Sequence, residues 1–108
     1  MKWYKNLYMG ETATDTKHKI LRNVVKRRFS NNEYLITISA NPDNLLDILP
    51  AEVLLQKHYK DNTDKLYIVG IANGKEEALE VVRQIIDEVY TNTGEFDIPG
   101  YLKFGRNL

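Results

Sequence analysis

The chain has 108 residues, with 15 basic and 15 acidic side chains and no cysteine. Its length suits one domain, and its 43% apolar and 28% charged residues are close to the globular average. This composition excludes wholesale disorder and fibrous repeats. The absence of cysteine excludes disulfides, thiol catalysis and cysteine-based metal sites.

Hydropathy gives no sign of a membrane span. The longest unbroken apolar run, Leu66 to Ala72, has seven residues, whereas a membrane-spanning helix needs about 20. The N-terminus reaches the polar Gly10-Glu11-Thr12 without the apolar segment of a signal peptide. We therefore expect a cytoplasmic protein.

The zero net charge conceals two poles. Residues 1–28 hold eight basic and two acidic side chains, a net charge of +6, so residues 29–108 carry −6. Much of the negative charge lies in 76–97, where seven acidic residues accompany a lone Arg83. The zero net charge argues against a partner chosen by overall charge. The chain nevertheless has a basic N-terminal region and an acidic remainder.

The first half of the chain predicts a helix and a strand. The N-terminal segment is too aromatic for a free tail, and we expect it to be docked, in extended form. A helix is expected from Thr14 or Asp15 to about Arg28, because apolar residues recur there with helical spacing. Residues 34–40 alternate and are rich in β-branched and aromatic side chains, which predicts a strand.

The second half predicts a helix broken at Pro50, a strand and a last helix. We expect a short helix over 43–49 and another from Pro50 to about Lys60, with His58 turned inward. Residues 66–72 are apolar on both faces, as in a strand between two helical layers. Residues 75–90 form an amphipathic pattern that predicts a helix.

This order predicts a single three-layer α/β domain built on a parallel β-α-β core. Its elements are helix, strand, helix broken at Pro50, strand and helix. Because a two-stranded sheet is thin for a domain, we expect a further short strand from a terminus or pairing with a second copy.

A ligand site, if the protein has one, is expected beyond the carboxyl ends of the two strands. Parallel strands would bring both following loops together, and each loop opens a helix whose free N–H groups favour an anion. The same residues also suit ordinary turns and caps. The candidate ligand-binding residues are Ser39, Asn41, Asp43, Asn44, Asn73, Gly74 and Lys75.

No catalytic, metal or cofactor motif is present. The two histidines, His18 and His58, lack metal-ligand spacing, and the serines lack a nucleophile elbow. The loop at Gly74-Lys75 lacks the following Ser or Thr of a phosphate-binding P-loop. We expect no cofactor and no metal, and the pattern favours a protein without enzymatic activity.

The basic stretch is the sharpest feature of the sequence. It can serve as a solvated face, pair with the acidic helix of the same chain or of a partner, or meet nucleic-acid phosphates or an acidic membrane surface. We favour a solvated or paired face over binding to nucleic acid or to a membrane. No base-reading motif accompanies the stretch, which argues against nucleic-acid recognition. The candidate residues are Lys17, Lys19, Arg22, Lys26, Arg27 and Arg28.

Three segments of the sequence carry a resemblance to other proteins: Asn41-Pro-Asp-Asn-Leu-Leu-Asp47, Tyr67-Ile-Val-Gly-Ile-Ala72, and Thr93-Gly-Glu-Phe-Asp97 with Tyr101-Leu102. They resemble a group of small bacterial proteins of about this length, along nearly the whole chain. The resemblance implies a compact bacterial protein of the cytoplasm. It brings no activity and no catalytic or binding residue.

Three functions remain open. The one we prefer is a non-enzymatic module that binds itself, as a homodimer, or another protein. The second is a nucleic-acid accessory protein that uses residues 17–28. The third is a small-ligand or enzyme domain with its site at the two loops that follow the strands.

Overall fold

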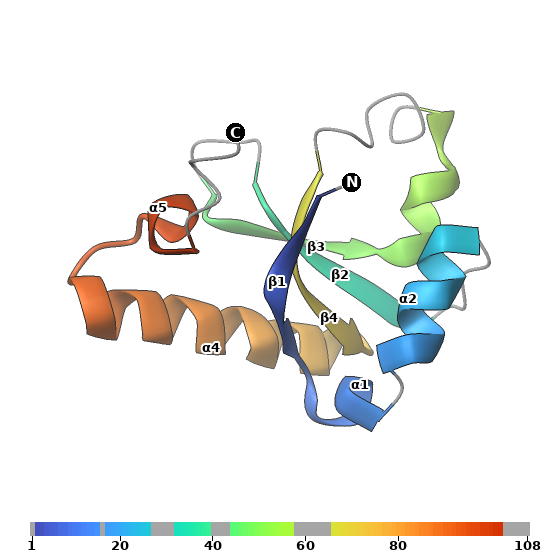
Figure 1. Cartoon of the computed structure of the whole chain (residues 1–108), viewed down its shortest axis with the longest axis horizontal. Helices are drawn as coiled ribbons and strands as arrows, with labels where there is room; N and C mark the ends of the chain where they lie inside the picture. The colour runs from blue at the N-terminus through green and yellow to red at the C-terminus, as the bar shows by residue number, and fades with distance from the viewer. Residues whose placement is uncertain (1, 16, 27–31, 40–43, 58–65, 103–108) are drawn as a thin grey trace.

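The computed structural model describes residues 2–15, 17–26, 32–39, 44–57 and 66–102. Among them it shows five helices, one of them a 3₁₀ helix, and four strands (Figure 1). In chain order these are β1 (Lys2–Met9), α1 (Glu11–Asp15), α2 (Lys17–Lys26), β2 (Glu33–Ile38), β3 (Leu46–Pro50), the 3₁₀ helix η1 (Ala51–Leu55), β4 (Tyr67–Asn73), α4 (Lys75–Thr93) and α5 (Ile98–Leu102).

The four strands form one mixed sheet in the order β1-β4-β2-β3. β1 runs parallel to β4, whereas β2 is antiparallel to both β4 and β3. The aromatic N-terminal segment thus supplies the extra edge strand that a terminus was expected to add. The result is a small α/β domain with a mixed sheet.

The predicted parallel pairing of the two buried strands is wrong. Ile36 of β2 lies opposite Gly70 of β4 in an antiparallel register. The reason is β3, which pairs antiparallel with β2. The chain therefore already runs opposite to β2 when it leaves β3 for β4. β3 and β4 therefore flank β2 in the same direction, and the crossover passes between them through η1.

The helix predicted over 43–49 is also wrong, because Leu46–Pro50 is strand β3. A short apolar run is compatible with the periodicity of a helix and with that of a strand. Here the pairing with β2 stabilises the strand. Of the helix predicted from Pro50 to Lys60, the structure shows the 3₁₀ helix η1 followed by an extended Gln56 and a helical Lys57, and residues 58–60 lie outside the described chain. His58 lies outside the described residues.

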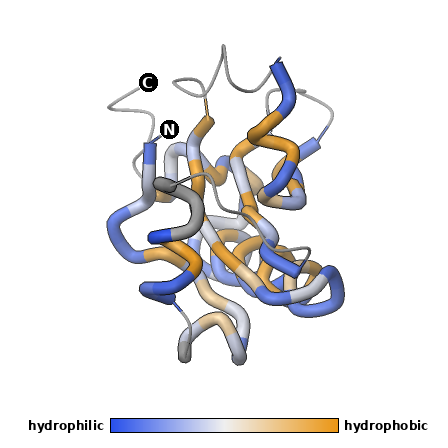
Figure 2. The backbone as a smooth tube through the Cα atoms, turned by 90° about the vertical axis from the view of Figure 1, so that its right-hand side faces the viewer, coloured by the Kyte–Doolittle hydropathy of each residue, from blue (hydrophilic) through white to orange (hydrophobic). Residues whose placement is uncertain are grey.

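Helices cover both faces of the sheet, so the domain has three layers (Figure 1). Neighbouring residues of β2 point to opposite layers: Ile36 packs with α4 and α5, and Leu35 packs with α1, α2 and η1. Figure 2 shows the hydrophobic stretches running through the middle of the molecule. Burial of these two apolar clusters is the main force that stabilises the fold.

β4 is buried on both sides, as its sequence predicted. A Cβ at Gly70 would lie 3.0 Å from the Tyr8 carbonyl oxygen and 3.1 Å from Val81 Cγ1. The glycine thus lets β1 and α4 approach the centre of the sheet closely. The helix predicted from Thr14 or Asp15 to about Arg28 is present as α2, over Lys17–Lys26, and the short helix α1 at Glu11–Asp15, which was not predicted, precedes it.

Candidate functional site

Polar contacts between distant parts of the chain form two clusters. The first cluster lies at the carboxyl ends of β1 and β4. These parallel neighbours end side by side, and each leads into a helix, α1 or α4. The Glu77 carboxylate lies between the two junctions. It accepts hydrogen bonds from the backbone N–H of Ala13 at 3.0 Å and of Asn73 at 3.2 Å. The hydroxyl and the backbone N–H of Thr12 donate to the same carboxylate.

This carboxylate occupies the place that a bound anion would take at the start of α1. Its partial burial opposes ionisation, but the hydrogen bonds from Thr12, Asn73 and Ala13 outweigh it and lower the pKa of Glu77. A negative charge of the chain itself therefore satisfies the free N–H groups here. The arrangement holds α1 against α4, and these donors are already hydrogen-bonded to the Glu77 carboxylate.

The predicted ligand loops do not come together. Ser39 follows β2, and Asn73 ends the antiparallel β4, so the two residues lie at opposite ends of the sheet. Asn44 lies at the Ser39 end, while Gly74 and Lys75 lie with Asn73 at the start of α4. Asn41 and Asp43 lie outside the described residues. The loop that accompanies Asn73 is the β1–α1 junction, whose Thr12 hydroxyl accepts a hydrogen bond from Asn73 Nδ2 at 3.3 Å.

Tyrosines form a second polar cluster between β1, α4 and α5. The Tyr8 hydroxyl donates a hydrogen bond to Glu88, and the Tyr4 and Tyr8 rings are stacked with centroids 6.1 Å apart. Asn92 Nδ2 donates to the Tyr101 hydroxyl at 3.1 Å. Burial and the adjacent Glu88 raise the pKa of Tyr8, so this phenol stays neutral and acts as a donor. The cluster ties β1 and α5 to α4.

The basic face belongs to α2, on the other side of the sheet. Ile20 anchors this helix in the core, with an exposure of 1%. Lys19 and Arg22 are exposed, and Lys17 is half-buried. Arg27 and Arg28 lie outside the described residues, as does the side chain of Lys26.

Helix α4 carries two neighbouring rows of apolar side chains. One row is buried against the sheet and consists of Ala78, Val81, Ile85 and Val89. The second row, which we call the α4 stripe, consists of Leu79, Val82, Ile86 and Tyr90. Val82 and Ile86 are half-buried, but Leu79 and Tyr90 are each 53% exposed. The exposed ring of Phe96 stacks on Tyr90 with centroids 4.9 Å apart.

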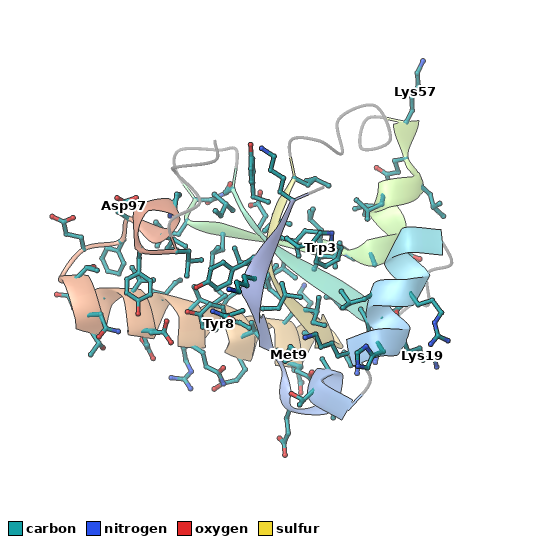
Figure 3. All side chains as sticks on the ribbon, in the orientation of Figure 1. Trp3, Tyr8, Met9, Lys19, Lys57 and Asp97 are labelled. Atoms are coloured by element: carbon teal, nitrogen blue, oxygen red, sulfur yellow. The ribbon has the colours of Figure 1, made fainter. Side chains whose placement is uncertain are left out.

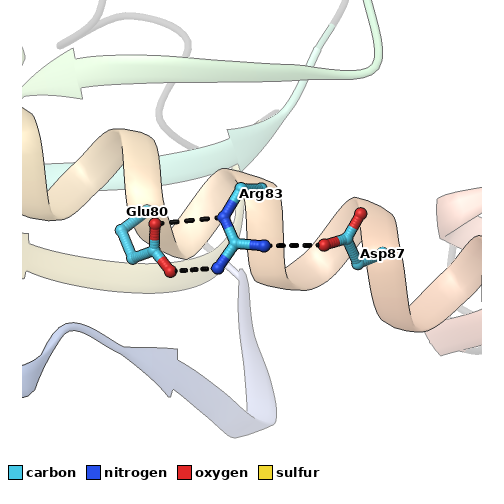
Figure 4. Close-up of polar contacts among 3 residues, drawn as sticks. All are labelled: Glu80, Arg83 and Asp87. Atoms are coloured by element: carbon cyan, nitrogen blue, oxygen red, sulfur yellow. Dashed lines mark hydrogen bonds and ion pairs between the residues drawn. The ribbon is translucent and has the colours of Figure 1, made fainter.

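Charged side chains border the α4 stripe on its solvent side. Arg83 binds Glu80 through Nε at 3.1 Å and Asp87 through Nη1 at 2.9 Å (Figure 4). The hydrogen bonds from Arg83 lower the pKa of Glu80, which keeps this carboxylate ionised. We call the exposed acidic residues around the stripe and Phe96 the acidic rim; they are Glu76, Glu80, Asp87, Glu95 and Asp97.

The exposed apolar row of α4 was not predicted as a candidate site, although the sequence contains a signal for it. Residues 78–90 are apolar over an arc too wide for a single packing face. The pairing of Glu77 with α1 and of Glu88 with Tyr8 had no such signal. Both pairs join residues more than 60 positions apart, and only the fold brings them together.

In the described parts of the chain, no group of three or more His, Asp or Glu side chains is placed to hold a metal ion. Nor does any helix among the described residues have the length and apolar character needed to cross a membrane. No family model matches the chain, and no curated protein or solved structure matches it either.

Proposed function

We propose that this protein is a non-enzymatic interaction module that binds a second copy of itself through the α4 stripe. One observation carries the proposal: Leu79 and Tyr90 are each 53% exposed in the same row of α4, and Phe96 extends the row. Aromatic side chains exposed beside aliphatic ones supply much of the binding energy in protein interfaces. The resemblance to small bacterial proteins supports a bacterial cytoplasm as its setting.

The sheet edges support association through α4 rather than through strand pairing. β1 carries the exposed Lys2 and Lys5, and its register with β4 is irregular. β3 has five residues and ends on Pro50, which has no N–H to donate. Short strands, lysines and proline are the features that prevent edge strands from adding a neighbour.

The polar clusters support a role without catalysis. A general acid or base needs a free position next to a substrate. The Glu77 carboxylate is instead engaged by α1 and by Asn73, and Glu88 is engaged by Tyr8. Both groups have a clear role in holding the fold together.

Sedimentation velocity over a range of protein concentrations tests the proposal. The weight-average mass of the wild-type chain should rise with concentration. Replacing Leu79 and Tyr90 together by serine removes exposed apolar surface, so we expect association at least about tenfold weaker. Because both side chains are half exposed, the variant should retain its helical circular dichroism.

Leu45→Ser is the matched control. Leu45 is also exposed, at 40%, but it lies directly before β3 and is not part of the α4 stripe. Association of this variant should equal that of the wild type. A wild-type chain that stays monomeric at every concentration would overturn the proposal, as would equal losses in the control and the stripe variant.

A further inference from the structure

The exposed basic residues of α2 and the acidic rim lie on opposite sides of the sheet. Lys19 and Arg22 project from α2 in one outer layer, and the acidic rim belongs to α4 and the segment after it, in the other. Figure 3 shows the labelled Lys19 and Asp97 at opposite ends of the molecule. The sheet therefore separates Lys19 and Arg22 from the acidic rim of the same chain.

The ion pairs of the structure agree with this separation. Among the described residues, ion pairs join Arg83 to Glu80 and to Asp87, all within α4. Their side chains are 50% to 62% exposed, so another cation can still reach the two carboxylates. The exposed basic residues of α2 have no such acidic neighbour among the residues that the structure describes.

The chemistry of the α4 surface fits long basic side chains. Lys and Arg place their aliphatic stems on apolar surface while their charged ends stay in a polar environment. The α4 stripe offers that apolar surface, and the acidic rim lies where the charged ends would reach. The stacked rings of Tyr90 and Phe96 add an aromatic face over which a guanidinium binds favourably.

We infer that the α4 stripe of one copy receives the basic α2 face of the next copy. The inference rests on the proposed function, since it takes the stripe as the binding surface and names what covers it. Lys19 and Arg22 would meet Glu80, Asp87 and the Tyr90–Phe96 pair. Such an interface joins two different surfaces, so each copy keeps one free surface of each kind. The assembly therefore grows as a ring or an open chain rather than stopping at a symmetric dimer.

Charge favours this arrangement over α4 packing on α4. A two-fold pairing of stripes would bring two acidic rims together, with Arg83 already engaged in each copy. Like charges facing each other across an interface are costly. Packing of α2 on α4 instead brings the positive pole of the sequence to the negative one.

Two charge-reversed variants test the inference by sedimentation. The first carries Lys19→Glu and Arg22→Glu, so only its α4 surface can bind. The second carries Glu80→Lys and Asp87→Lys, so only its α2 surface can bind. All four positions are exposed, and circular dichroism checks that each variant folds.

Each variant alone should be monomeric, with self-association at least about tenfold weaker than in the wild type. An equimolar mixture should associate again, because the intact α4 surface of the first variant meets the intact α2 surface of the second, and the two reversed surfaces also carry opposite charges. If the first variant still self-associates, the inference is wrong, and the serine variant of Leu79 and Tyr90 then shows separately whether the α4 stripe is the binding surface. If the mixture stays monomeric while the wild type associates, the inference is also wrong.

Salt gives an independent measurement on the wild-type chain. Association should weaken severalfold between about 20 mM and about 500 mM salt, because screening removes attraction between exposed charges. Association that strengthens with salt would indicate paired acidic rims and overturn the inference. So would a monomeric wild type whose Lys19 and Arg22 are needed to bind a short DNA duplex.

Discussion

The backbone N–H of Ala13 donates a hydrogen bond to the Glu77 carboxylate at 3.0 Å, although 64 positions separate the two residues. Ala13 is completely buried in α1, and Glu77 lies in the first turn of α4. The bond therefore joins the junction after β1 to the junction after β4. It fixes α1 against the sheet, where Ala13 contributes to the core shared with α2.

Glu77→Gln should destabilise the fold by about 1–3 kcal/mol, because hydrogen bonds to a carboxylate are stronger than those to a neutral amide. The change keeps the shape of the side chain and removes its charge. Urea unfolding followed by circular dichroism measures the loss. Glu76→Gln is the control: Glu76 is exposed, so its change should stay within about 0.5 kcal/mol.

The stabilisation by Glu77 should depend on pH. The pKa of this carboxyl is lowered in the folded chain from its ordinary value of 4.5, so the folded state favours the ionised form. Its contribution is present above the unfolded value and is lost as the pH falls through the folded value. The difference in unfolding free energy between wild type and Glu77→Gln should therefore be constant near neutrality and shrink below about pH 4.5. A difference that does not change down to pH 3 would contradict this role.

Gly10→Ala should destabilise the chain through the same carboxylate. A Cβ at Gly10 would overlap the Glu77 side chain, so the carboxylate must leave its donors. We expect a loss of about 1–3 kcal/mol in the wild type. In a Glu77→Ala background the same substitution meets no carboxylate and should cost less than about 0.5 kcal/mol. A double-mutant cycle by urea unfolding measures the coupling, and additive effects would refute it.

Tyr8 should resist ionisation, because burial and the neighbouring Glu88 raise its pKa. In a protein with ¹³C-labelled tyrosine, the Tyr8 resonance should still be unshifted near pH 10, where an ordinary phenol is half ionised. Glu88→Gln removes the negative charge and should bring the Tyr8 titration to lower pH. An unchanged Tyr8 titration in the variant would show that burial alone sets its pKa.

Much of the fold followed from local patterns in the sequence. The apolar run at 66–72 gave β4, the amphipathic run at 75–90 gave α4, and the alternation at 34–40 gave β2. The error at Leu46–Pro50 has a physical reason. Five residues hold too little periodicity to separate a strand from a turn of helix, and the partner β2 makes the choice.

That one element changed the prediction of the site. A helix at 43–49 makes the β2–β4 connection a parallel crossover and brings Ser39 beside Asn73. A strand there reverses the chain again, so Ser39 and Asn73 lie at opposite ends of the sheet. A candidate site assembled from two loops depends on strand direction, which in turn depends on every element between them.

The sequence by itself determined the α/β class of this domain, its buried strand β4, its long helix α4 and the +6 and −6 poles. These properties follow from the periodicity and charge of neighbouring residues. Tertiary structure alone decided strand direction, the partners of Glu77 and Glu88, and the placement of the basic and acidic helices in opposite layers. Such contacts join distant residues, and their free energy depends on how the whole sheet packs rather than on any local pattern.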